Sequence, residues 1–281
     1  MDKICQDFLT HLKVNGYNSR YEIIFNSFIN HCLNNNINYL LLSLSDLNTY
    51  LLLLKNKNYS NGTINIELNA IRCFYRFLML NNHITEDLYD KQIKKMPLLR
   101  VETKVKTYLT YKEIKDIVEL GEAFVYHMSP LKIRALLWLW FYTGLRPSEM
   151  IALRRIDVDL KAMKLLVRIP NKTKTERYAY FNKFVKVRLE EFFNYEAEKY
   201  NAFNINVKKL QVLFKALKDF CPGKNINGMV MRHSFAHYLV LKNVNMRTAQ
   251  KLLGHKELDN TAVYYDPNDI EVEKTYRELL K

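Results

Sequence analysis

The sequence predicts a mainly α-helical protein of two domains, with one small antiparallel sheet in the second domain. The chain has 281 residues, and domains average roughly 150 residues. It contains only 7 Gly and 6 Pro, well below the usual share of about 12%, so turns are few. Apolar residues recur at helical spacing along most of the chain, and short β-like runs are confined to residues 156–181.

The charge and apolar content limit the class of partner. Lys and Arg number 43 against 29 Asp and Glu, which gives a net charge of +14. Such an excess favours a polyanion, either nucleic acid or an anionic membrane surface. Apolar residues make up 48% of the chain, too many for a disordered basic tail.

Targeting and redox signals predict a cytoplasmic protein. The first residues, MDKICQDFLTHLK, contain no apolar signal core, and no apolar run reaches the roughly 20 residues that span a bilayer. The four cysteines lack CxxC spacing and are expected to be reduced thiols, with neither disulfides nor a zinc site: Cys5, Cys32, Cys73 and Cys221.

The first domain is expected over residues 1–90, as a bundle of about four helices at 3–15, 20–34, 46–56 and 63–81. Ser45 and Asp46 can cap the third helix and Asn61 the fourth. Residues 91–107 contain six Lys or Arg and no helical stripe, so they are expected to form a basic linker. Such a linker can lie along phosphates or remain a solvated tether.

The second domain is expected over residues 108–281. Thr110 is a candidate cap for a helix that ends at Gly121, and the wholly apolar run 131–142 predicts a buried helix. Three short strands are expected at 156–160, 164–169 and 177–181, followed by helices at 183–200, 207–220, 229–242 and 246–253. Gly254 is a helix-ending glycine, and a last amphipathic helix is expected at 270–280.

Several motifs occur in a fixed order within this second domain. They are TGLRPSE at 143–149, a Lys-bearing hairpin at 171–177, MRHSFAHYL at 231–239, and LLGH at 252–255 with Tyr264 nine residues later. Each alone has an ordinary structural explanation: the arginine can pair with a carboxylate, and the histidine can be a packing residue. Together they strongly resemble the tyrosine recombinase (integrase) family of DNA strand-transfer enzymes.

The resemblance covers the whole chain and implies a helical, SAM-like core-DNA-binding domain, a basic linker and the family's catalytic fold. It implies these site residues: Arg146 and Arg232 as the two catalytic arginines, Glu149 as the acidic residue, Lys172 as the hairpin lysine, His255 as the LGH histidine and Tyr264 as the nucleophile. Lys174 is an alternative to Lys172. Tyr265 adjoins Tyr264, but the family spacing from His255 favours Tyr264.

These residue types suit cleavage of a phosphodiester. Two guanidinium groups can hold the non-bridging oxygens by charge-assisted hydrogen bonds, so neither a metal nor any other cofactor is expected. A phenol can form a phosphotyrosine ester that a DNA hydroxyl later reverses. Lys172 can protonate the departing 5′ oxygen, His255 can bind the same phosphate, and Glu149 can orient its neighbours.

The sequence departs from the family at Met229, three residues before Arg232, where the family usually has His or Lys. Met cannot transfer a proton, so either the role is dispensable or Lys224 or water supplies it. If Met229 is tolerated, Met229→Ala retains cleavage.

The resemblance implies a clamp on double-stranded DNA and a homotetrameric assembly in which the C-terminal helix packs onto a neighbouring subunit. Packing of that helix within its own subunit stays open. The absence of an arm-site domain indicates a simple recombinase, either a mobile-element integrase or a chromosome-dimer resolvase. Two rival functions are a type IB topoisomerase and a catalytically weak or inactive DNA-binding accessory protein; a role at a membrane surface is a poorer third.

Overall fold

The computed structural model describes residues 2–101, 106–168, 176–196, 200–255 and 259–265. The chain divides into two compact units, Met1–Lys104 and Val105–Lys281. The prediction of a mainly helical protein with a small three-stranded antiparallel sheet is confirmed. No described helix combines the length and the apolar character that a bilayer crossing requires.

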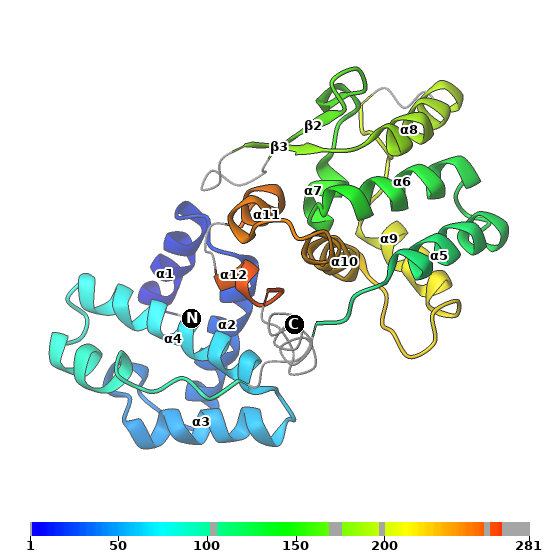
Figure 1. Ribbon diagram of the computed structural model, residues 1–281. Helices are drawn as coiled ribbons and strands as arrows, with labels where there is room; N and C mark the ends of the chain where they lie inside the picture. Colours follow the sequence, from blue (N-terminus) through cyan, green and yellow to red (C-terminus); the bar gives the residue numbers. More distant parts are fainter. Residues whose placement is uncertain (1, 102–105, 169–175, 197–199, 256–258, 266–281) are drawn as a thin grey trace, which may run out of the picture. The chain divides into compact units, whose positions relative to one another are not determined.

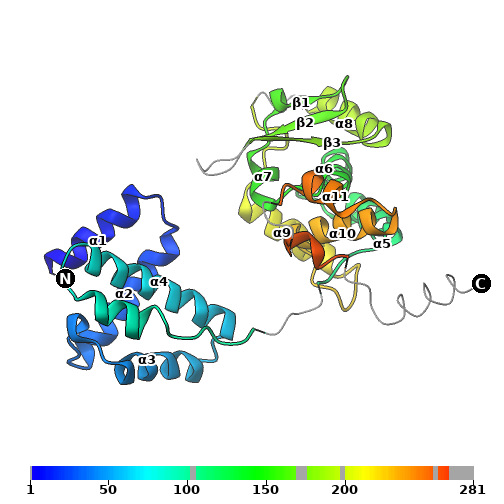
Figure 2. The same ribbon diagram turned by 60° about the vertical axis from the view of Figure 1, so that its left-hand side comes forward.

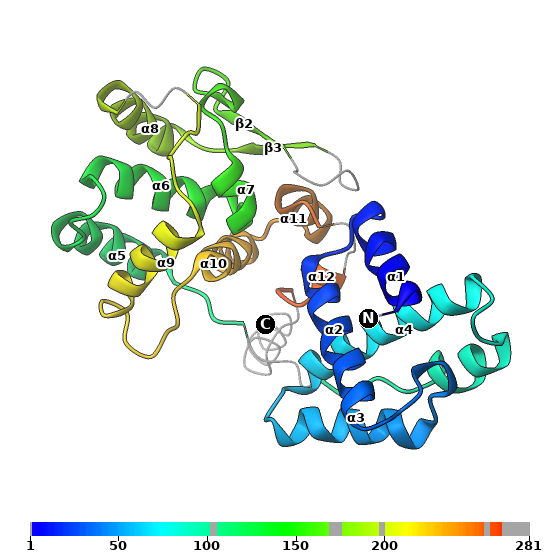
Figure 3. The same ribbon diagram turned by 180° about the vertical axis from the view of Figure 1, so that it is seen from behind.

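The first unit is a bundle of four helices, shown in Figures 1 and 3. Its elements are α1 (Lys3–Val14), α2 (Ser19–Asn34), η1 (Tyr39–Leu41), α3 (Leu44–Asn56), α4 (Asn61–Leu80) and the π-helical turn η2 (Leu88–Ile93). The four expected helices are therefore present, and aromatic rings such as Phe8, Phe28 and Phe74 fill the space between them.

Two helix starts in this unit differ from the prediction by a few residues. Helix α3 is capped by Ser43, whose side chain accepts from the backbone N–H of Asp46 while the Asp46 carboxylate accepts in return. Helix α4 is capped by Ser60, one residue before the expected Asn61. Several residues in each stretch can cap a helix, and sequence alone does not rank them.

The start of the expected linker packs against the first unit. Ile93 is buried in its core, the backbone N–H of Leu99 donates to Asn65 Oδ1 at 2.8 Å, and Arg72 donates to the carbonyl of Met96. Residues 93–99 are therefore held against α4, while part of the remaining linker lies outside the described residues.

Within its described residues, the second unit contains the sheet and the helices labelled α5 to α12. The elements are α5 (Tyr111–Phe124), α6 (Pro130–Thr143), α7 (Pro147–Ala152), η3 (Arg155–Asp157), β1 (Val158–Asp159), β2 (Lys164–Val167), β3 (Arg177–Tyr180), α8 (Lys183–Tyr195), α9 (Val207–Lys218), α10 (Gly228–Leu241), α11 (Met246–Leu253) and α12 (Asp259–Ala262). Helix α12 was not expected from the sequence, and the expected helix 270–280 lies outside the described residues.

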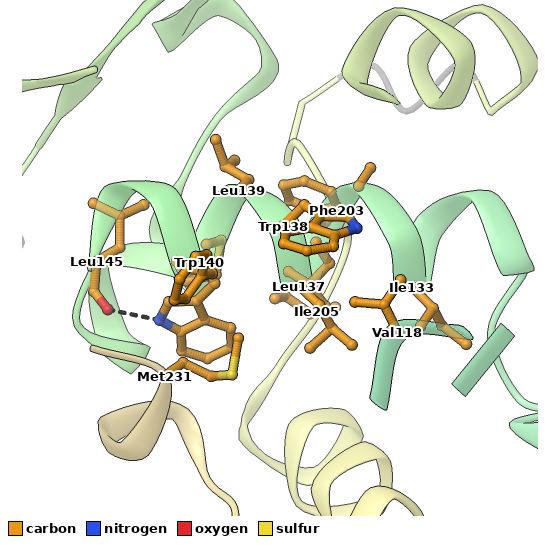
Figure 4. Packing of buried hydrophobic residues seen from close by; sticks show 14 of the residues in the cluster. Val118, Ile133, Leu137, Trp138, Leu139, Trp140, Leu145, Phe203, Ile205 and Met231 are labelled. Atoms are coloured by element: carbon orange, nitrogen blue, oxygen red, sulfur yellow. Dashed lines mark hydrogen bonds between the residues drawn. The ribbon is translucent and has the colours of Figure 1, made fainter. Parts of the chain in front are cut away.

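Helix α6 is the centre of this unit, in agreement with its wholly apolar sequence. It contacts α5, α8, α10 and β3, and Figure 2 shows it surrounded by them. The sheet has the order β1-β2-β3, with Val158 opposite Leu165 and Leu165 opposite Ala179. Figure 4 shows Trp138 and Trp140 of this helix, with Phe203 and Met231 packed beside them.

Candidate active site

The first expected arginine lies on a turn that the core holds in place. Helix α6 ends at Gly144, which has a φ of 57°, and an added Cβ there would lie 2.3 Å from Phe235 Cδ1. The indole N–H of the buried Trp140 donates to the carbonyl of Leu145 at 2.7 Å (Figure 4). Arg146 follows directly and precedes Pro147, the first residue of α7, so its backbone position is fixed from both sides.

The buried carboxylate of Glu149 lies close to three arginine side chains. Its side chain is only 4% exposed, Oε1 lies 2.8 Å from Arg146 Nη1, and Oε2 lies 2.9 Å from Arg177 Nη2. Arg232 Nη1 is 4.0 Å from Oε2. The backbone N–H of Arg146 also donates to Oε2 at 2.8 Å. Glu149 therefore holds in one cluster the guanidiniums of the residue before α7, of β3 and of α10.

The two expected arginines also donate to consecutive carbonyls at the end of α11. Arg146 Nη2 donates to Gly254 at 3.0 Å, and Arg232 Nη2 donates to Leu253 at 2.6 Å. Arg232 Nη1 donates to Gly144 at 2.6 Å. The structure thus brings Arg146 and Arg232 together, although they are 86 residues apart in the sequence.

Arg177 is a further member of the cluster whose part in the site was missed from the sequence. Its side chain is 14% exposed, and within the described part of the chain its Nε and Nη1 are buried without a hydrogen-bond partner. Gly254, with a φ of 65°, leaves room for it, since an added Cβ would lie 2.1 Å from Arg177 Nε. A lone arginine at the start of a strand gives no sequence signal that distinguishes it from a surface residue.

The pKa values reflect a crowded, partly buried cationic site. Burial and the neighbouring Arg146 charge lower the pKa of Arg232 to about 9. Burial opposes ionisation of Glu149, but the Arg177 and Arg146 guanidiniums outweigh it and leave the pKa of the carboxyl below its usual value. At neutral pH the cluster therefore holds three arginine cations around a single carboxylate, so it has positive charge left for an anion.

Tyr264 and Tyr265 point to different partners. The Tyr264 hydroxyl lies 2.5 Å from Nδ1 of His233 on α10, whereas the Tyr265 hydroxyl donates to the carbonyl of Val244 at 2.6 Å. Burial raises the pKa of Tyr264 to about 12, although Arg232 acts in the opposite direction. Of the two phenols, Tyr264 is the one within the electrostatic reach of the cluster.

His255 follows the glycine that ends α11. Its Nδ1 lies 2.8 Å from Thr261 Oγ1, which fixes the ring relative to the segment that carries Tyr264. Burial and the charges of Arg232 and Arg146 lower the pKa of His255 to about 4. At neutral pH the ring is therefore neutral and can donate one hydrogen bond.

Two other residues beside Tyr264 were not singled out from the sequence. Lys106 Nζ lies 4.4 Å from the centre of the Tyr264 ring, and burial and Arg232 lower its pKa. His233 immediately follows Arg232 in the quoted motif, but its contact with Tyr264 spans 31 residues. Lys106 belongs to the stretch interpreted as linker, so its position beside a phenol could not be read from composition.

Met229, where the sequence departs from the family pattern, is partly exposed and borders a cavity. Met229 lies at the start of α10 and lines an apolar cavity of about 430 Å³ together with Trp140, Pro147 and Phe214. Lys224, which the sequence offered as a substitute, lies 2.6 Å from Glu113 Oε1 and donates to the carbonyl of Tyr108 at 3.0 Å. Lys172 and Lys174 fall outside the described residues.

Comparison with known proteins identifies the class to which this chain belongs. Residues 107–271, more than half of the chain, match the model described as the phage integrase family. The chain belongs to this family, and it is a site-specific tyrosine recombinase.

Individual relatives and solved structures are consistent with this family. Tyrosine recombinase XerC of Pediococcus pentosaceus is 28% identical over 257 residues, 85% of this chain and 82% of the relative. Tyrosine recombinase XerA of Thermococcus onnurineus is 27% identical over 226 residues, 76% and 74% of the two chains. The Tn1549 transposon integrase in complex with transposon right end DNA has a TM-score of 0.75 at 18% identity and covers 99% of both chains.

A second solved structure, a lambda integrase dimer bound to a core site, has a TM-score of 0.72 at 16% identity and covers 96% of both chains. These two likenesses show that the fold is shared.

Proposed function

We propose that this recombinase cleaves and rejoins DNA strands through a 3′-phosphotyrosine intermediate formed on Tyr264. The proposal is carried by one observation: Arg146 and Arg232 donate to adjacent carbonyls of one turn beside a shared carboxylate, and the charge of Arg232 acts on the Tyr264 phenol. Guanidiniums and a phenol in one site match the needs of a phosphodiester attacked by an oxygen nucleophile.

In the proposed reaction the Tyr264 oxygen attacks the phosphorus, and a Tyr–O–P bond forms while the bond from phosphorus to the 5′ oxygen breaks. Arg146 and Arg232 donate to the non-bridging oxygens, where negative charge accumulates. His255, as a neutral donor, binds the same phosphate. Lys172, or Lys174 in its place, gives its proton to the departing 5′ oxygen. Glu149 keeps the arginines in position and does not react.

The biological role that we propose is integration or excision of a mobile element, or resolution of chromosome dimers. The relatives described as XerC and the structure of a transposon integrase are consistent with both roles. Mapping the cleaved DNA ends in the source genome distinguishes them, because the cut site lies either at the borders of an element or at a single chromosomal locus.

We also propose that four copies assemble on paired DNA sites and that the C-terminal segment of each subunit packs onto its neighbour. Residues 266–281 contain Ile270, Val272, Tyr276, Leu279 and Leu280 at helical spacing. If so, a chain truncated after residue 267 cleaves a single site but no longer forms the tetrameric complex, which light scattering with DNA measures. If the truncated chain still formed the full tetramer, the proposed packing of the C-terminal segment onto a neighbouring subunit would be contradicted.

A suicide substrate with a nick beside the cut site tests the central proposal. The chain should form a protein–DNA adduct that survives denaturing electrophoresis, Tyr264→Phe should abolish it, and Tyr265→Phe should retain it. The reverse pattern reassigns the nucleophile, and no adduct at saturating DNA indicates an accessory protein. Strand exchange between two sites, rather than relaxation of supercoils alone, distinguishes a recombinase from a topoisomerase.

A further inference from the structure

We propose that His233 accepts the proton of the Tyr264 hydroxyl during DNA cleavage and returns it during rejoining. The inference rests on the proposed function, in which Tyr264 is the nucleophile. It gives a role to a histidine of the MRHSFAHYL segment that is not among the expected site residues.

The geometry carries the proposal. Nδ1 of His233 lies 2.5 Å from the Tyr264 hydroxyl, within the reach of a general base in the unliganded site, and the two ring centres are 5.7 Å apart. His233 lies on α10, a 14-residue helix whose buried residues include Arg232. The imidazole of His233 and the guanidinium of Arg232 therefore project from the same helix.

His233 also lies one helical turn after Met229. Residues four apart lie on the same side of a helix, so the imidazole approaches the site from the side of α10 on which the Met229 thioether borders the apolar cavity. With the imidazole of His233 against the Tyr264 hydroxyl, proton transfer does not require a titratable side chain at 229.

The other candidate bases have different partners. Lys224 is held by Glu113, and His255 Nδ1 lies against Thr261. Lys106 contacts the Tyr264 ring face, not the hydroxyl. Among the residues that the structure describes, His233 is the one with a hydrogen bond to the Tyr264 oxygen.

The protonation state fits an acceptor. Burial, followed by the charges of Lys106 and Arg232, lowers the pKa of His233 to about 4, so the ring is neutral at pH 7. With the remaining proton on Nε2, Nδ1 offers a lone pair to the hydroxyl. A DNA phosphate in the site would add a negative charge beside Lys106 and Arg232 and so raise the basicity of the imidazole.

The proton balance closes over the reaction. As the Tyr264 oxygen bonds to phosphorus, its proton moves to Nδ1 and His233 becomes an imidazolium, while the hairpin lysine protonates the 5′ oxygen. In rejoining, a DNA 5′ hydroxyl attacks the phosphotyrosine and loses its proton to the lysine. The bond from phosphorus to the tyrosine oxygen breaks, and the imidazolium returns its proton to the phenol.

The test compares three variants of the full chain on the nicked suicide substrate. His233→Gln keeps the polar character and approximate size but cannot act as a base, and we expect adduct formation to slow by about 100-fold or more with unchanged DNA binding. His237→Gln is the matched control, since His237 lies one turn further along α10 and stacks on Tyr108 at 3.7 Å. Met229→Ala should also retain the wild-type rate.

The pH profile separates proton transfer from a structural role. The wild-type rate should be level from about pH 6 to 8, because His233 is neutral in this range and Arg232, with a pKa of about 9, stays charged. The His233→Gln rate should rise about tenfold per pH unit, since the phenol, with a pKa of about 12, must then ionise into solvent. Added imidazole should partly restore His233→Ala, which also answers the case in which the Gln variant folds poorly.

A substrate with sulfur in place of the bridging 5′ oxygen distinguishes a base from an acid. A thiolate departs without a proton. This substrate should therefore restore the cleavage rate of a variant that lacks the general acid, but His233→Gln, which lacks the proposed base, should stay slow. Full rescue by sulfur, or a wild-type rate and a level pH profile for His233→Gln, would overturn the inference. An adduct formed by Tyr264→Phe would instead overturn the proposed function, so the two failures are distinguishable.

Discussion

At the scale of single residues, Glu149 is the carboxylate that holds the arginines of the site together. A buried carboxylate is costly unless it is paired, and here Arg146 and Arg177 both lie within 3 Å of it. Arg232 has its own pair of carbonyl acceptors. The consequence is a set of guanidiniums that is assembled before DNA arrives, which is the condition for electrostatic stabilisation of a transition state.

Glu149→Gln tests this interpretation. Removal of one partner of a buried ion pair leaves the other charges uncompensated, so we expect a loss of about 3 kcal/mol in the free energy of unfolding. Both tryptophans, Trp138 and Trp140, belong to the second unit, so urea unfolding followed by their fluorescence reports on that unit. Glu119→Gln is the control, because its side chain is 63% exposed and pairs with Lys115 at 3.7 Å.

The same pair of proteins has a predictable pH dependence. The pKa of Glu149 is lower in the folded protein than in an unfolded chain, so its contribution is present above the unfolded value of about 4.3 and is lost as the pH falls through the folded value. The stability difference between wild type and Glu149→Gln should be largest at pH 6–7 and shrink below about pH 4. A constant difference from pH 3 to 7 would contradict the assignment.

At the scale of elements, the sequence predicted what local patterns determine. The apolar run 131–142 became α6, Thr110 caps α5 with a reciprocal bond to Glu113, and Gly254 ends α11 in the left-handed region. These features depend on neighbours within a few residues. The contacts of Arg177 with Glu149 and of His233 with Tyr264 join separate elements, so they cannot be predicted from periodicity or motif spacing. Helix α12 has only four residues, too few for a periodic pattern.

Gly254 is the element-level position where a small change should have a large effect. In Gly254→Ala the new Cβ would lie 2.1 Å from Arg177 Nε at a φ of 65°, so either Arg177 or the turn must move. Gly223→Ala is the matched control, since Gly223 has a φ of 79° but no atom within 4 Å of an added Cβ. The control should lose only the roughly 1 kcal/mol of a left-handed alanine.

We expect Gly254→Ala to lose clearly more stability than the control and to slow adduct formation at least tenfold, because Arg146 and Arg177 are both displaced. Thermal melting and the suicide substrate measure the two effects. Equal melting temperatures for the two variants, with full cleavage by both, would show that the turn tolerates the extra methyl group.

At the scale of the whole molecule, the net charge of +14 attracts DNA over a longer range than any single contact. Contacts between Lys or Arg and phosphates release counterions, so affinity falls linearly with salt on a logarithmic scale. If six to ten phosphates are contacted, the affinity should fall by about 10³ to 10⁵ between 50 and 200 mM salt. Fluorescence anisotropy with Tyr264→Phe measures this without cleavage, and a flat salt dependence would contradict phosphate-dominated binding.

The turn that ends α11 has a consequence for control of the enzyme. The carbonyls of Leu253 and Gly254 accept hydrogen bonds from both arginines, and the next eleven residues include His255 and Tyr264. A small shift of α11 would therefore displace both guanidiniums and the segment that carries the phenol at the same time. In the proposed reaction these groups act on one phosphate, so the position of α11 would affect phosphate binding and the placement of the nucleophile together.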